Sequence, residues 1–138
     1  MTTWPKTYTP ETAPREVIEL AGQLVPQMLI GGHPALKALR AQYDRGRVAC
    51  VELTGAGFFV TYQVPDDSPR AEPSDFQGGD ARIEAAGVSH GAGCVLFVKT
   101  GRIAFLECDT CDGAWPENAK VLAVKDVFPL VPPSEPYT

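Results

Sequence analysis

The sequence predicts an α+β fold in which N-terminal helices pack on one antiparallel sheet of about five or six strands. Apolar residues recur at helical spacing over the first third of the chain and mostly at every second position after residue 47. Short turns join most of the predicted strands, which is typical of an antiparallel sheet. The length of 138 residues, with 44% hydrophobic and 21% charged residues, indicates a single domain over residues 1–138.

The first helix is predicted to follow residues 1–12, which we expect to form an extended arm. Thr12 is the expected N-cap of this helix. The apolar positions at helical spacing are Val17, Ile18, Ala21, Leu24, Val25, Met28 and Leu29. Pro26 lies inside this pattern and lacks a backbone donor, so the helix is expected to kink or restart there. Gly31-Gly32 is the expected end of the first helical unit.

A second helix is predicted to begin at Pro34, because proline suits the first position of a helix. Its apolar stripe is formed by Ala35, Leu36, Leu39 and Tyr43. Gly46 is expected to end this helix in the left-handed conformation. The helix and the residue that follows its end carry most of the clustered basic residues, which we interpret as a solvated face.

Two strands, Val48–Thr54 and Phe58–Val64, are predicted to form a hairpin around the short link Gly55-Ala56-Gly57. On the first strand, one face is expected to carry Ala49, Val51 and Leu53. Residues 65–80 are rich in proline, aspartate and glycine without periodicity, and we expect a long exposed loop there.

A further strand is predicted over Ala81–Ala85, where apolar residues alternate with charged ones. Ala119–Val124 is the last predicted strand. The final segment, residues 128–138, contains four prolines and is expected to form a Pro-rich tail.

The most apolar part of the chain is the predicted hairpin of Cys94–Lys99 and Arg102–Cys108, which Thr100-Gly101 separates. A two-residue link with glycine between two apolar runs is typical of a tight antiparallel hairpin. Because no other segment is as apolar, we expect this hairpin at the centre of the sheet. An acidic loop that includes Trp115-Pro116 follows it.

The charge balance restricts the classes of partner. The formal net charge is −5 and the sequence pI is about 4.9, so the chain repels phosphate backbones and nucleic acid is not an expected partner. A basic protein is the partner that this charge favours. No stretch approaches the roughly 18 consecutive apolar residues of a membrane helix, and membrane insertion is not expected.

The N-terminus shows no apolar run typical of a signal peptide, so a cytoplasmic location is predicted. The cysteines are then expected to be reduced thiols. They are Cys50, Cys94, Cys108 and Cys111. Cys50 and Cys94 are interpreted as small buried hydrophobic residues.

A zinc site is one alternative, with His90, Cys94, Cys108 and Cys111 as ligands, because Cys-x-x-Cys is half of a common zinc knuckle. Cys94, however, is predicted to begin a strand, and this placement disfavours zinc. A redox role for the Cys108/Cys111 pair is disfavoured as well, because a turn and not a helix follows it. Neither a phosphate-binding loop nor a Gly-x-Ser-x-Gly elbow is present, so no cofactor and no catalytic residue is predicted.

Acidic residues supply the remaining functional signal, since nine of the seventeen fall in two segments, residues 65–80 and residues 107–117. An acidic rim with Trp115 and Phe76 as anchors could dock a basic partner. The predicted partner- or ligand-binding residues are His90, Glu107, Asp109, Asp112 and Trp115. Glu52 and Glu107 interrupt apolar strands and are expected on their solvent side. The plain alternative for all of these acids is a solvated surface.

Several short motifs resemble a group of small uncharacterised bacterial proteins. They are Thr54-Gly55-Ala56-Gly57-Phe58-Phe59, His90-Gly91-Ala92-Gly93, Leu106-Glu107 and Trp115-Pro116. They follow a "TGxGFF" hairpin, an "hGxGxxLF" strand and a closing "LExxxYdxxWP" pattern over about residues 34–118. Where the group tends to have an aromatic residue, this chain has Cys111. The order of strand, glycine, strand and Leu-Glu is also similar to small immunity proteins of bacterial toxin systems.

Three functional hypotheses follow. The first is a non-enzymatic bacterial protein that acts through protein contacts, as an immunity protein would. The second is a small-molecule-binding domain or minor enzyme with a pocket between helices and sheet, lined by His90, Glu52, Glu107 or Cys108. The third is the small zinc-binding domain.

Overall fold

A computed structural model describes residues 4–110, 113–116 and 118–133. The helices are α1 (Arg15–Met28) and α2 (Pro34–Arg45), and the strands are β1 (Lys6–Tyr8), β2 (Arg47–Leu53), β3 (Gly57–Gln63), β4 (Phe76–Ala85), β5 (Ala92–Lys99), β6 (Arg102–Thr110) and β7 (Val121–Phe128). The predicted α+β class with an antiparallel sheet is confirmed. The sheet has seven strands in place of five or six, because Lys6–Tyr8 inside the predicted arm pairs with β2.

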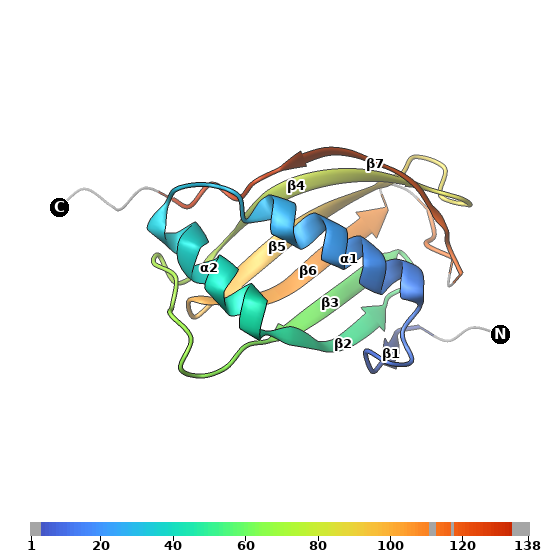
Figure 1. The fold of residues 1–138 in the computed structure, drawn as a ribbon. Helices are drawn as coiled ribbons and strands as arrows, with labels where there is room; N and C mark the ends of the chain where they lie inside the picture. Colours follow the sequence, from blue (N-terminus) through green and yellow to red (C-terminus); the bar gives the residue numbers. More distant parts are fainter. Residues whose placement is uncertain (1–3, 111–112, 117, 134–138) are drawn as a thin grey trace.

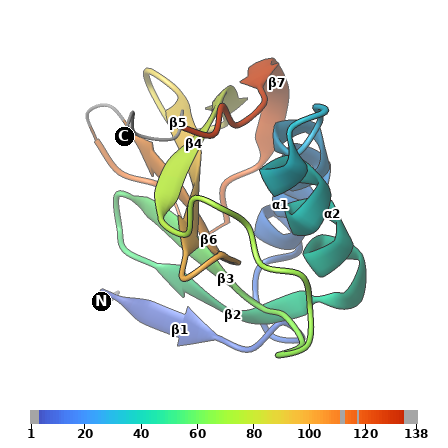
Figure 2. The ribbon, with the colours of Figure 1, turned by 90° about the vertical axis from the view of Figure 1, so that its left-hand side faces the viewer.

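The strands form one sheet in the order β1-β2-β3-β6-β5-β4-β7, and every pairing is antiparallel. Both helices lie on the same side of this sheet, as Figures 1 and 2 show. The core fills the space between the helices and the sheet. No helix of the described residues lies on the opposite face of the sheet (Figure 2). None of the helices in the described part of the chain is long and apolar enough to cross a membrane.

Helix α1 buries one apolar stripe, formed by Val17, Leu20, Ala21, Leu24, Val25 and Met28. Its N-cap is Pro14, and Thr12 instead accepts a 3.0 Å hydrogen bond from the backbone N–H of Thr9. Pro26 falls in the last turn, and the helix ends two residues later at Met28. The predicted restart at Pro26 and the predicted end at Gly31-Gly32 are therefore wrong.

Helix α2 begins at Pro34 as predicted, and Nδ1 of His33 accepts a 3.0 Å hydrogen bond from the Ala35 N–H as a cap. Gly46 does not adopt the expected left-handed conformation, because its φ is −89°. A close approach explains the glycine: a Cβ atom at this position would lie 2.9 Å from the backbone oxygen of Gln42.

The predicted central hairpin is confirmed. β6 occupies the middle position of the seven strands and pairs with β5. Thr100 and Gly101 have φ values of 50° and 74°, as the two central residues of a type I′ turn require. On its core face, Cys94 lies directly opposite Cys108, and the two form a disulfide.

This disulfide corrects the expectation of reduced thiols for Cys94 and Cys108. The register of the hairpin places their Cα atoms 4.2 Å apart, which is close enough for a disulfide. The spacing of the two cysteines in the sequence does not reveal this pairing. Disulfides are uncommon in the cytoplasm, and the cytoplasmic location stays a prediction.

Two segments that were predicted as irregular are more ordered than expected. Residues 76–80 of the predicted loop belong to β4, whose register shifts between Gly78 and Ala81 and so hides the alternation. The remaining loop is tied to the hairpin turn, where the Ala71 N–H donates a 2.9 Å hydrogen bond to the Gly101 oxygen. β7 extends to residue 128, and Leu130 of the predicted tail is buried and donates a 2.8 Å backbone hydrogen bond to Met28.

The hairpin of β2 and β3 is confirmed, with one correction on β2. Val51 and Leu53 are buried as predicted, whereas Ala49 is exposed. The register between β2 and β3 shifts between Val48 and Cys50, so one residue is inserted and the alternation changes phase.

Candidate functional site

The helix-free face of the sheet carries three half-buried phenylalanines from adjacent strands. Phe59 on β3, Phe105 on β6 and Phe97 on β5 are each followed by a buried core residue, so their own side chains lie on the face of the sheet away from the core. The rings of Phe59 and Phe105 meet edge to face at 5.6 Å, and those of Phe97 and Phe105 stack at 4.6 Å. Such geometries stabilise aromatic pairs. A continuous aromatic surface therefore lies on the side of the sheet that no helix covers.

Two carboxylates flank this aromatic surface. Glu52 on β2 is the direct cross-strand partner of Phe59, and Phe59 is the direct partner of Glu107 on β6. Since neighbouring strands lie about 4.8 Å apart, the two glutamate Cα atoms are about 10 Å apart with the ring between them. We call Glu52, Phe59, Phe97, Phe105 and Glu107 the acidic–aromatic patch.

Both glutamates are half-buried on the outer side of their strands, which confirms the expectation that they lie on the solvent side. The ion pairs formed among the described residues involve neither of them. The patch already hosts one cation, because Nζ of Lys99 lies 5.9 Å from the centre of the Phe97 ring. Cations are attracted to aromatic ring faces in this way.

The residues predicted to bind a partner are not brought together. Glu107 belongs to the acidic–aromatic patch, Asp109 is exposed near the end of β6, and His90 is exposed in the turn before β5. Trp115 is only 2% exposed and packs edge-on against Phe58 at 5.2 Å. Trp115 is therefore a core residue, and its predicted role as an exposed anchor is wrong. Asp112 lies outside the described residues.

Phe76, the other predicted anchor, is half-buried and packs against the core. The zinc alternative loses two of its ligands, because Cys94 and Cys108 are bonded to each other, and Cys111 lies outside the described residues. Within the described ranges, no group of three or more metal-ligating side chains is present.

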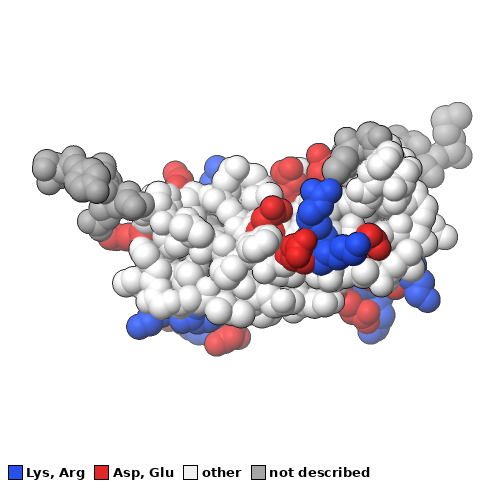
Figure 3. All heavy atoms as spheres, turned by 90° about the horizontal axis from the view of Figure 1, so that it is seen from above, with Lys and Arg blue, Asp and Glu red and all other residues white. Residues whose placement is uncertain are grey.

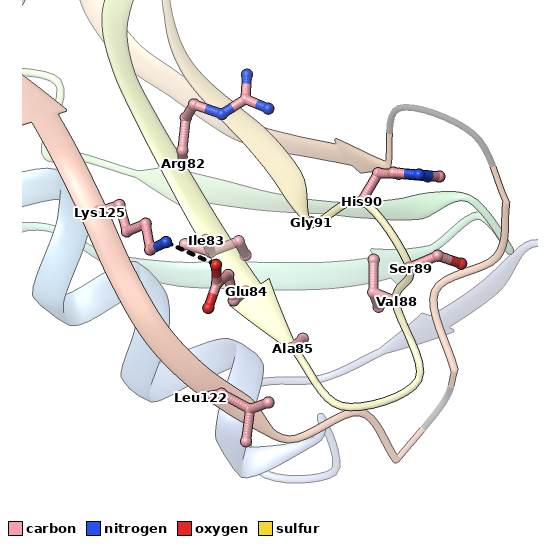
Figure 4. A pocket seen from close by; sticks show the side chains of 10 residues that line it. All are labelled: Arg82, Ile83, Glu84, Ala85, Val88, Ser89, His90, Gly91, Leu122 and Lys125. Carbon is pink, nitrogen blue, oxygen red and sulfur yellow. Dashed lines mark ion pairs between the residues drawn. The ribbon is translucent and has the colours of Figure 1, made fainter.

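The four residues proposed to line a pocket between helices and sheet do not converge. Cys108 faces the core, whereas Glu107 and Glu52 face the opposite side of the sheet. His90 instead borders a cavity of about 480 Å³ beside β4 and β7, shown in Figure 4. No helix residue lines that cavity.

The same cavity contains an ion pair between the Lys125 ammonium and the Glu84 carboxylate, 2.7 Å apart. The hydrogen bond that the Lys125 ammonium donates to the Glu84 carboxylate, together with the negative charge of Glu84, raises the pKa of Lys125. Glu84 lies on β4 and Lys125 on β7. Apart from their charges, nothing in the sequence indicates that these two residues form an ion pair.

Phe97 and Phe105 were missed because the sequence shows only that their strands, β5 and β6, are apolar at nearly every position. That pattern indicates apolar residues on both faces of the sheet, but it does not indicate which face the helices cover.

In comparisons with known proteins, no family model matches the chain, and no curated protein or solved structure matches it.

Proposed function

We propose that this protein acts through contacts with a protein partner and that the partner inserts an arginine side chain into the acidic–aromatic patch. The observation that supports this most directly is the row Glu52–Phe59–Glu107, three direct cross-strand neighbours on a sheet face without a helix. Neither carboxylate is used in an ion pair among the described residues. The row thus has charge and ring surface available to a partner.

The chemistry of the row suits a guanidinium group. Arginine stacks its planar guanidinium on aromatic rings and donates paired hydrogen bonds to a carboxylate. A guanidinium above Phe59 would have a carboxylate on each side, at Glu52 and at Glu107. Covering the rings of Phe97 and Phe105 would add the burial of apolar surface. The net charge of −5 would also accelerate the approach of a basic partner.

The most specific form of this proposal is an immunity protein of a bacterial toxin system. Such a protein neutralises its toxin by covering the toxin's surface, and an acidic surface suits a basic toxin. The similarity of the strand, glycine, strand and Leu-Glu order to immunity proteins supports this form. No catalytic step is required of the chain in this role.

The experiment uses a defined probe in place of the partner. A peptide with alternating glycine and arginine is titrated into the ¹⁵N-labelled protein, and amide shifts are followed by NMR. We expect saturable shifts that centre on residues 52, 59 and 107. Glu107→Gln should weaken the affinity by about 3- to 10-fold, because a desolvated charged contact contributes about 1 kcal/mol or more.

The matched control is Glu19→Gln, which removes the same charge from an exposed site on α1, on the other side of the sheet. This variant should leave the affinity within about twofold, a change of less than 0.5 kcal/mol. Equal losses in Glu107→Gln and Glu19→Gln, or shifts spread over all acidic segments, would show that the peptide is attracted only by net charge.

A further inference from the structure

A second surface lies apart from the acidic–aromatic patch, at the end of the sheet where β4 turns into β5. The cavity of about 480 Å³ described above opens there, between residues 88–91 and strand β7. Figure 3 views the molecule from the side of β4 and β7, where a mixed group of basic and acidic side chains lies beside a broad uncharged surface. A cavity of this volume is within the range of small-molecule sites.

The charge of the cavity differs in sign from the charge of the whole chain. Its lining contains two basic side chains, Arg82 and Lys125, and one carboxylate, Glu84. The Glu84 carboxylate is bound to Lys125 at 2.7 Å, and Figure 4 shows the Arg82 side chain pointing away from that pair. Arg82 has no ion pair with any of the described residues. The Lys, Arg and Glu side chains that line the cavity therefore carry one net positive charge, whereas the net charge of the whole chain is −5.

The backbone leaves room for a ligand beside this guanidinium. The cross-strand partner of Arg82 on β5 is Gly93, and a Cβ atom at Gly93 would have the Ala81 oxygen, at 4.0 Å, as its nearest neighbour. No side chain at this position covers the guanidinium. The Ser89 hydroxyl on the rim adds a neutral hydrogen-bond donor.

The other wall of the cavity is apolar. Leu122 on β7 is 65% exposed, and Val88 is half-buried opposite it. A ligand that touches both walls needs an anionic group and an apolar portion. We infer that this cavity binds a small organic anion, with its carboxylate or phosphate held by Arg82 and its apolar portion against Leu122 and Val88.

The test titrates phenyl phosphate, benzoate, inorganic phosphate and neutral benzyl alcohol into the ¹⁵N-labelled protein. At least one of the two aromatic anions should give saturable shifts of the Ser89 and Gly91 amides and of Arg82 Nε, with a Kd of about 1 mM or below. Inorganic phosphate should bind at least about fivefold more weakly than the better aromatic anion, and benzyl alcohol should not saturate. Phenyl phosphate and benzoate distinguish a phosphate from a carboxylate ligand.

Two variants and one control complete the test. Arg82→Gln should weaken the binding of the aromatic anion at least tenfold, and Leu122→Ser should weaken that binding while leaving inorganic phosphate unaffected. Arg15→Gln removes the same charge from an 88%-exposed side chain on α1 and should change nothing. The spectra themselves report whether each variant is folded. Absence of saturation up to about 10 mM, equal affinity for inorganic phosphate and both aromatic anions, or equal losses in Arg82→Gln and Arg15→Gln would each overturn the inference.

Discussion

The side-chain oxygen of Gln42 on α2 accepts a 2.9 Å hydrogen bond from the backbone N–H of Ile103 on β6. The amide nitrogen of the same side chain donates hydrogen bonds of 2.7 Å to the backbone oxygens of Pro69 and Gly101. Gln42 is fully buried. One side chain therefore connects the second helix, the central hairpin and the loop before β4.

We predict that Gln42→Leu lowers the free energy of unfolding by about 2–3 kcal/mol, because the buried backbone groups lose their partner. Denaturant unfolding followed by circular dichroism measures this change. The control is Gln23→Leu, at an exposed position of α1, which should change the stability by less than about 0.5 kcal/mol. A similar small effect in both variants would mean that water replaces the Gln42 contacts.

The disulfide between Cys94 and Cys108 gives a second prediction. The two residues are separated by 14 positions, and cross-linking a loop of about 15 residues stabilises a fold by about 3 kcal/mol. A reductant should lower the unfolding midpoint of the natural protein and leave the double variant Cys94→Ala/Cys108→Ala unchanged. Alkylation of the unfolded, unreduced chain, followed by mass spectrometry, should leave these two cysteines unlabelled. Labelling of both would contradict the pairing.

Replacing glycine by alanine should change the stability in opposite directions at two positions, Gly101 in the hairpin turn and Gly22 in α1. Gly101 has a φ of +74°, and a Cβ atom there would lie 3.0 Å from the Ala71 oxygen, so Gly101→Ala should destabilise the fold by about 1–2 kcal/mol. Gly22 lies inside α1, and a Cβ atom would meet nothing within 4 Å. Gly22→Ala should therefore stabilise the fold by about 0.5–1 kcal/mol. Thermal unfolding of both variants measures the two signs, and a stabilising Gly101→Ala would refute the turn geometry.

The stability of the fold at high pH should depend on the ionisation of the Tyr62 phenol. Burial, and then the neighbouring Tyr43, raise the pKa of the Tyr62 phenol well above its usual range. Because the pKa is higher in the folded state, the neutral phenol contributes its full stabilisation below the unfolded pKa of about 10. This contribution is lost as the pH rises above that value. The free energy of unfolding of Tyr62→Phe should therefore fall less steeply above pH 10 than that of the natural protein. Parallel curves would contradict this.

Salt should weaken the binding of the arginine peptide to the acidic–aromatic patch. Raising the salt concentration from about 50 mM to about 300 mM shortens the screening length to below 10 Å, so the Kd should rise several-fold. Phe59→Ala should weaken the binding at both salt concentrations by a similar factor, since ring stacking and burial depend little on ionic strength. A loss in Phe59→Ala that appears only at low salt would mean that the ring contributes nothing of its own.

Much of the fold could be predicted from the sequence where local chemistry determines it. Thr100-Gly101 predicts the central hairpin, and Pro34 marks the start of α2, because turn and helix-start residues act over a few positions. β1 could not be predicted, since three residues between prolines carry no alternation. The first half of β4 was missed for a related reason: the irregular register near Gly78 interrupts the alternation.

The candidate sites were less predictable, because they depend on contacts between distant segments. The solvent-side placement of Glu52 and Glu107 follows from alternation along their strands. Their joint position around Phe59 depends on the register of three strands, which no local pattern specifies. The burial of Trp115 likewise depends on its contact with Phe58, from a hairpin more than fifty positions earlier in the chain.

The central position of β6 has a consequence for recognition. Glu107 lies between Leu106 and Cys108, whose side chains are both anchored in the core, so the backbone that carries this carboxylate is fixed before any partner arrives. A preorganised surface loses little conformational entropy on association. The backbone of β6 should therefore have the same conformation in the free and the bound protein. Any conformational change on binding should occur in the partner.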